Sequence, residues 1–136
     1  MELYFKDRQH EEDSNCFLKA FGKSDFTTDV EYGVLSYVLG AVNKKKDLML
    51  AVDEEGIDIE QLYGILDVYS SSERSMIRFG VQCFNASIDD IKLADVVSSL
   101  DNENLRVVKT ALDLRYFKRG TANKTRKTYA KQNFTQ

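Results

Sequence analysis

The chain has 136 residues, 43% of them hydrophobic, which is enough to build one ordinary core and matches the usual size of a single domain. No apolar run reaches the roughly 18 residues of a membrane-spanning helix, and the N-terminus lacks the charged-then-apolar order of a secretory signal, so we expect a cytoplasmic protein. The charge is uneven: residues 1–117 hold all 22 acidic residues against 13 basic ones, a net of −9, whereas residues 118–136 carry +6.

The absence of proline indicates the fold class. The chain has no proline and only seven glycines, whereas the loops of a β-rich protein of this length would normally use several prolines. The sequence therefore predicts an all-α fold, a compact bundle of five to seven helices that forms a single domain over residues 1–117. The basic C-terminal tail, residues 118–136, has few apolar groups and is expected to be partly disordered.

The first predicted helix begins at Asp7, whose carboxylate can cap the exposed N–H groups of the following turn, and runs to about Phe21, with Gly22 as its stop. Its early turns, which include His10, are very polar. Only its second half needs to be buried, through the apolar patch Cys16, Phe17, Ala20 and Phe21.

Residues 28–42 predict a strongly amphipathic core helix, because their apolar residues recur at helical spacing on one face. The lysine triplet 44–46 then suits the C-terminal end of that helix and a solvated turn. Asp47 is expected to start another helical stretch as far as Val52. After the acidic turn 53–56, residues 57–66 suggest a short helix, although the alternation of Ile57 and Ile59 leaves a brief strand open there.

The clearest helix start lies at Ser70, where the pattern S-x-x-E to Glu73 is typical of a reciprocal capping box. The helix predicted over residues 73–84 is apolar over most of its circumference, so we expect it to be the most buried one and Phe84→Ala to cost about 3–5 kcal/mol. Gly80 in its interior indicates the close approach of a neighbouring helix.

Two further helices follow. Ser87 and Asp90 support a helix through Leu100, with Ile91, Leu93, Ala94 and Val97 among its apolar residues. Asp101 can cap the last helix, which carries apolar stripes to Leu114.

A search for catalytic chemistry finds little. His10 is the only histidine, so a zinc site would lack ligands, and a local capping or salt-bridging role is the favoured interpretation. Cys16 and Cys83 lack C-x-x-C spacing and are predicted to be buried free thiols. Residues 70–75 could hold an anion at a helix N-terminus, but capping explains them better. We therefore expect no catalytic residue, no metal site and no cofactor.

The basic tail is the one segment for which binding competes well with a merely solubilising role. Lys124, Lys127 and Lys131 would align if the segment became helical. Nucleic acid, or an acidic protein surface such as a second copy of this chain, would suit it. The predicted partner-binding residues are Lys118, Arg119, Lys124, Arg126, Lys127, Tyr129 and Lys131.

Three stretches resemble an uncharacterised group of small helical proteins from phages and mobile elements of Gram-positive bacteria. They are the opening residues 5–10 (FKDRQH), the serine-rich turn before an apolar helix that ends Phe84-Asn85, and the closing residues 111–116 (ALDLRY). The resemblance spans residues 5–116 and brings no activity, active site or cofactor with it. It implies a context, because small accessory proteins of phages commonly bind host proteins, including defence systems, or regulate the element's own genes.

These features together predict a non-enzymatic phage or mobile-element accessory protein in the bacterial cytoplasm that binds and modulates a host protein, such as a component of a defence system. The alternative is a nucleic-acid-binding regulator that uses the basic tail. No membrane partner is expected, and a homodimer is left open.

Overall fold

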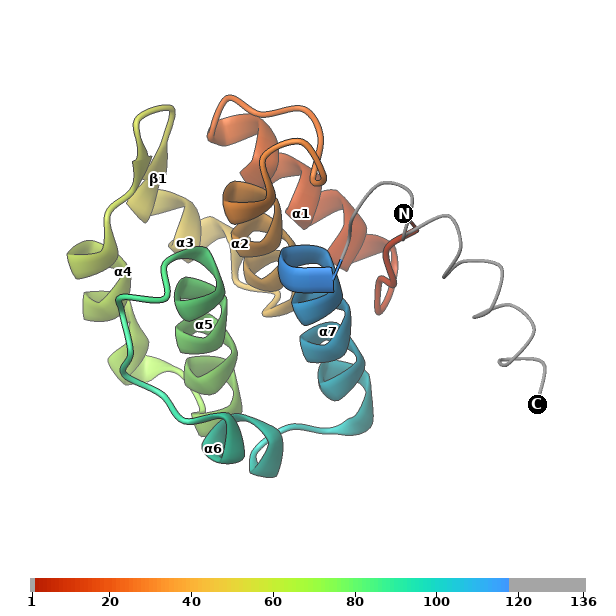
Figure 1. Ribbon diagram of the computed structural model, residues 1–136. Helices are drawn as coiled ribbons and strands as arrows, with labels where there is room; N and C mark the ends of the chain where they lie inside the picture. Colours follow the sequence, from red (N-terminus) through yellow and green to blue (C-terminus); the bar gives the residue numbers. More distant parts are fainter. Residues whose placement is uncertain (1, 118–136) are drawn as a thin grey trace, which may run out of the picture.

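Helices dominate the computed structural model, which describes residues 2–117 (Figure 1). The helices of this part are α1 (Arg8–Ala20), α2 (Val30–Ala41), α3 (Lys45–Leu48), α4 (Ile59–Ile65), α5 (Ser71–Phe84), α6 (Leu93–Ser98) and α7 (Asn102–Leu112). The 3₁₀ turns η1 (Met49–Ala51) and η2 (Leu66–Val68) and the π-helical turn η3 (Asp113–Phe117) extend α3, α4 and α7. A short antiparallel hairpin pairs β1 (Val52–Asp53) with β2 (Gly56–Ile57). The predicted all-α bundle is confirmed.

Side-chain caps fix where the main helices begin. In the described residues, five α-helices follow a residue whose side-chain oxygen accepts a hydrogen bond from the backbone N–H three positions later, which satisfies one of the unpaired donors of the first turn. These residues are Asp7, Asp29, Asp58, Ser70 and Asp101. The predicted caps at Asp7 and Asp101 and the capping box of Ser70 and Glu73 are therefore confirmed.

Gly22 ends α1 as the sequence predicts. Its φ of +77° is a left-handed conformation that glycine adopts without steric cost. The turn lets the N–H of Gly22 donate to the Lys19 carbonyl at 2.9 Å and the N–H of Lys23 donate to the Leu18 carbonyl at 3.0 Å, which satisfies two carbonyls of the last turn.

The centre of the bundle is α2, which contacts α1, α5 and α7 (Figure 1). All nine residues from Gly33 to Ala41 are buried, so the predicted one-sided amphipathic face is wrong. The prediction that the helix ending at Phe84 is the most buried is also wrong, because α5 leaves Arg78, Gln82 and Phe84 partly exposed. An interior helix is apolar all round because other helices cover every side of it.

Two glycines allow α1 and α5 to approach α2 closely. A Cβ on Gly80 would lie 2.9 Å from Val38 Cγ1, which confirms the predicted close contact at this glycine. A Cβ on Gly40 would lie 2.7 Å from the backbone nitrogen of Ser14, so α1 meets α2 backbone to backbone.

Local predictions fail in several places. Residues 44–46 were predicted to form a turn before a helix that starts at Asp47. Instead, α3 begins at Lys45, so Lys45 and Lys46 lie in its first turn. Residues 85–92 form an irregular strap, so neither Ser87 nor Asp90 starts a helix, and α6 has only six residues. Both cysteines were predicted to be buried, which is wrong for Cys16, because it is exposed, and confirmed for Cys83.

Within residues 2–117, no helix combines the length and apolarity needed to cross a bilayer.

Candidate functional site

A hollow of about 500 Å³ opens between α5, α6 and the C-terminal part of α7 with η3. We call it the α6 groove. Its apolar walls include Phe79 and Cys83 of α5, Leu93 and Val96 of α6, and Leu112 and Tyr116 of α7 and η3. The volume falls in the usual range for binding pockets in proteins, and predominantly apolar walls are typical of such pockets.

Polar contacts on both sides fix the shape of the groove. The strap, residues 85–92, is held to α5 because Gln82 donates to the Asp89 carboxylate at 2.9 Å and Arg78 pairs with Asp90 at 3.1 Å. On the other side, the Nε of Arg115 in η3 donates to the carbonyl of Cys83 at 2.9 Å. This bond satisfies an unpaired carbonyl at the end of α5 and anchors the turn that carries Tyr116.

Exposed apolar side chains surround the groove. Leu93 is 59% exposed and Val97 is 42% exposed, one helical turn apart on α6, while Tyr116 and Phe117 are 45% and 56% exposed on η3. From the sequence, Leu93 and Val97 are named among the apolar residues of this helix, whereas Val96 is the residue of α6 that is buried. Single exposed apolar residues are common, whereas a cluster around a hollow is typical of a binding surface.

Cys83 does not make the groove a nucleophilic site. Its side chain is buried in the wall, and desolvation raises the pKa of its thiol to about 12, with a smaller opposing effect from Arg115. The thiolate is the reactive form of cysteine, so this residue stays an inert apolar group near neutral pH.

A second hollow, of about 540 Å³, also borders the strap, and most of the residues that line it are charged. Its charged residues are Arg74, Arg78 and Lys92 and, with opposite sign, Asp89, Asp90 and Asp95. Because the two signs balance, this hollow offers no net attraction for an anion or a cation. It is a weaker candidate than the α6 groove.

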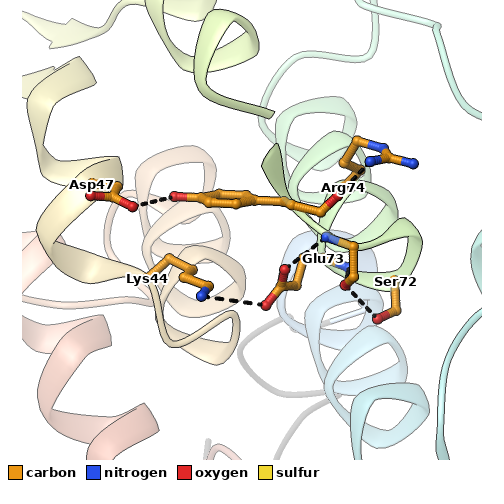
Figure 2. A network of polar contacts seen from close by, with 7 residues as sticks. Lys44, Asp47, Ser72, Glu73 and Arg74 are labelled. Atoms are coloured by element: carbon orange, nitrogen blue, oxygen red, sulfur yellow. Dashed lines mark hydrogen bonds and ion pairs between the residues drawn. The ribbon is translucent and has the colours of Figure 1, made fainter. Parts of the chain in front are cut away.

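The N-terminus of α5 is already occupied by the protein's own groups (Figure 2). The Glu73 carboxylate accepts the N–H of Ser70 at 2.9 Å and lies 3.9 Å from the Lys44 ammonium, so a carboxylate fills the place that an external anion would take. Nearby, the Tyr69 hydroxyl donates to Asp47 at 3.1 Å, and Arg74 donates to the Tyr69 carbonyl. This network joins α5 to α3 and supports the capping interpretation over an anion site.

His10 is a buried structural residue. Its Nδ1 accepts the backbone N–H of Lys6 at 3.0 Å, and its Nε2 lies 2.9 Å from the Tyr37 carbonyl of α2, to which it donates in the neutral tautomer. The expectation that only the second half of α1 needs to be buried is wrong for His10, because the N-terminal segment folds over this turn. Phe5 packs against the imidazole with its ring centroid 5.0 Å away.

We expect the protein to lose stability in acid through His10. Burial lowers the pKa of His10, with Lys6 acting in the same direction, while the Tyr37 carbonyl, Asp7 and Asp13 oppose the shift. The folded state therefore favours the neutral imidazole. Its contribution to the free energy of unfolding is fully present above the unfolded pKa of about 6.5 and is lost as the pH falls through the lower pKa of the folded state.

The measurement is direct because this is the chain's single histidine. An NMR titration of its imidazole should give a pKa below 6.5, and urea unfolding should show His10→Gln less stable at about pH 7.5 by roughly 1–3 kcal/mol, with a flatter acid dependence. An imidazole with a pKa at or above the ordinary value of 6.5 would contradict this.

The predicted partner-binding residues of the basic tail, Lys118 to Lys131, lie outside the described residues. Within residues 2–117, no group of three or more histidine, cysteine, aspartate or glutamate side chains is placed to hold a metal ion. The residues around the α6 groove were missed as a site because they belong to three separate segments, and no local pattern indicates that α5, α6 and η3 meet. Leu93 and Val97 were noted only as apolar residues of a helix, and their exposure is seen in the structure alone.

Comparisons with protein-family models, with curated proteins and with solved structures find no match to this chain.

Proposed function

We propose that this chain is a non-enzymatic accessory protein that binds another protein through the α6 groove and modulates it. The observation that supports the proposal is the exposed apolar cluster around a preformed apolar hollow. Apolar and aromatic side chains at the centre of an interface provide most of its binding energy. Leu93 and Tyr116 both line the hollow and are exposed, so they can serve as such contacts.

The resemblance to phage and mobile-element proteins suggests the class of partner. A host protein of a Gram-positive bacterium, including a component of a defence system, fits a small accessory protein with good packing and no recognised catalytic constellation. The modulation we propose is inhibition by occupancy, in which the bound chain covers a surface that the partner needs.

Capture from a host lysate tests the groove when matched variants are compared. Leu93→Asp places a charge at the groove, and Leu50→Asp is the control, because Leu50 is 67% exposed on η1, which does not line the groove. Both variants should keep the thermal stability of the parent, since exposed substitutions usually change it little. We expect a stoichiometric host protein to be recovered with the parent and with Leu50→Asp but lost with Leu93→Asp. Equal recovery with both variants would contradict the proposal.

Nucleic-acid binding is the second candidate, favoured by the six basic and no acidic residues of the tail, residues 118–136. If all six neutralise phosphates of duplex DNA, log K should fall with log salt at a slope of about −5, near −0.9 per contact. Deleting the tail should then remove most of that slope, and material captured from the lysate should be nuclease-sensitive. Binding to DNA with a slope that survives the deletion would exclude this role for the tail.

A further inference from the structure

The tail begins at the mouth of the α6 groove. Tyr116 lines the groove, Phe117 follows it, and the chain continues for 19 residues, 118–136, which lie outside the described part. An extended segment of this length spans up to about 60 Å. It is therefore long enough to reach every wall of the groove from its own starting point.

The chemistry of the two parts is complementary. Residues 118–136 carry six positive charges and no negative one, and they include Tyr129 and Phe134. Residues 1–117 carry a net charge of −9, and the groove offers apolar walls whose lining includes one acidic and one basic residue, Asp89 and Lys92, so the attraction for a cationic segment comes from the body as a whole. A cationic segment with aromatic side chains suits an apolar groove on an acidic body, because charge attracts it and the aromatic rings can fill the hollow.

We propose that residues 118–136 dock in the α6 groove of the same molecule and are displaced when a partner binds. The inference rests on the proposed function of the groove, and it adds a built-in competitor. A segment tethered next to its site has an effective concentration in the millimolar range, so even a weak contact is well populated. A partner would then have to bind the groove more strongly than the docked tail does in order to displace it.

A paramagnetic label on the full chain tests the docking without any partner. The label is attached to Ala130→Cys in a Cys16→Ser background, because Cys83 is buried and unreactive. In isotope-labelled protein at low salt, the amide signals of Leu93 and Val97 should lose about half or more of their intensity relative to the reduced label, whereas those of the matched residues Leu50 and Val68 should not. Raising salt to about 0.5 M should weaken the effect, and Leu93→Asp should reduce it.

Equal signal loss at the groove and at Leu50 and Val68, or none at either, would overturn the proposal. So would an undiminished loss when the spin label and the isotope label are on different molecules, since that assigns the tail to a second copy. Failure here is distinct from failure of the proposed function. If a captured partner still requires Leu93 while the tail does not contact the groove, the groove binds partners and this inference alone is wrong.

Discussion

Phe17→Ala is expected to lower the free energy of unfolding by about 3–5 kcal/mol, the usual cost of removing a fully buried phenylalanine side chain. Phe17 is completely buried in the core, in the patch where α1 packs on α2. Truncation leaves a cavity that the surrounding helices fill only in part. Urea unfolding monitored by circular dichroism measures the change, because the chain contains no tryptophan.

Phe84→Ala is the matched comparison. Its ring packs against Tyr32, with the centroids 4.9 Å apart, but the side chain is only partly buried at the end of α5. Since less surface is lost than the sequence-based prediction assumed, the cost should be about 1–2 kcal/mol instead of about 3–5 kcal/mol. A cost for Phe84 equal to or above that for Phe17 would contradict the deeper burial of Phe17 in this structure.

Gly40→Ala is expected to destabilise the protein by about 3 kcal/mol, at the upper end of the cost of overpacking. The added Cβ would lie 2.7 Å from the backbone nitrogen of Ser14 and 2.9 Å from its Cα. Backbone atoms cannot move aside as the end of a side chain can, so α1 as a whole would have to shift from α2. The change is measured by thermal and urea unfolding.

Gly64→Ala provides the control for this substitution. Gly64 lies inside α4, and an added Cβ would have no atom within 4 Å. Alanine loses less backbone entropy than glycine in a helix, so this variant should be more stable by about 0.5–1 kcal/mol. If both variants changed stability by the same amount, the close contact between α1 and α2 would be refuted.

Short-range chemistry made part of the fold predictable. The caps at Asp7, Ser70 and Asp101 depend on residues within one turn of each other, and so does the stop at Gly22. Gly80 could be interpreted because glycine in a helix interior is costly unless a neighbour needs the space.

The remaining features depend on contacts that a local pattern does not contain. His10 is buried because Phe5 and Tyr37, from the N-terminal segment and α2, pack against its ring. From the sequence, we expected the helix that ends at Phe84 to be the most buried one. That place belongs to α2, because α1, α5 and α7 pack around it, and a local pattern does not contain these contacts. In α6, a helix of only six residues, Val96 and Val97 are adjacent, and the pattern does not decide which of them faces the core. The groove therefore could not be predicted.

The most direct test of the α6 groove as the binding site is the affinity of the purified partner for three chains, the parent, Leu93→Asp and Leu50→Asp, measured by calorimetry in one buffer. A central interface contact is worth about 2 kcal/mol or more, so we expect Leu93→Asp to weaken binding by roughly 30-fold and Leu50→Asp to leave it unchanged. Binding that is unaffected by Leu93→Asp, or weakened equally by both substitutions, would contradict the assignment of the groove.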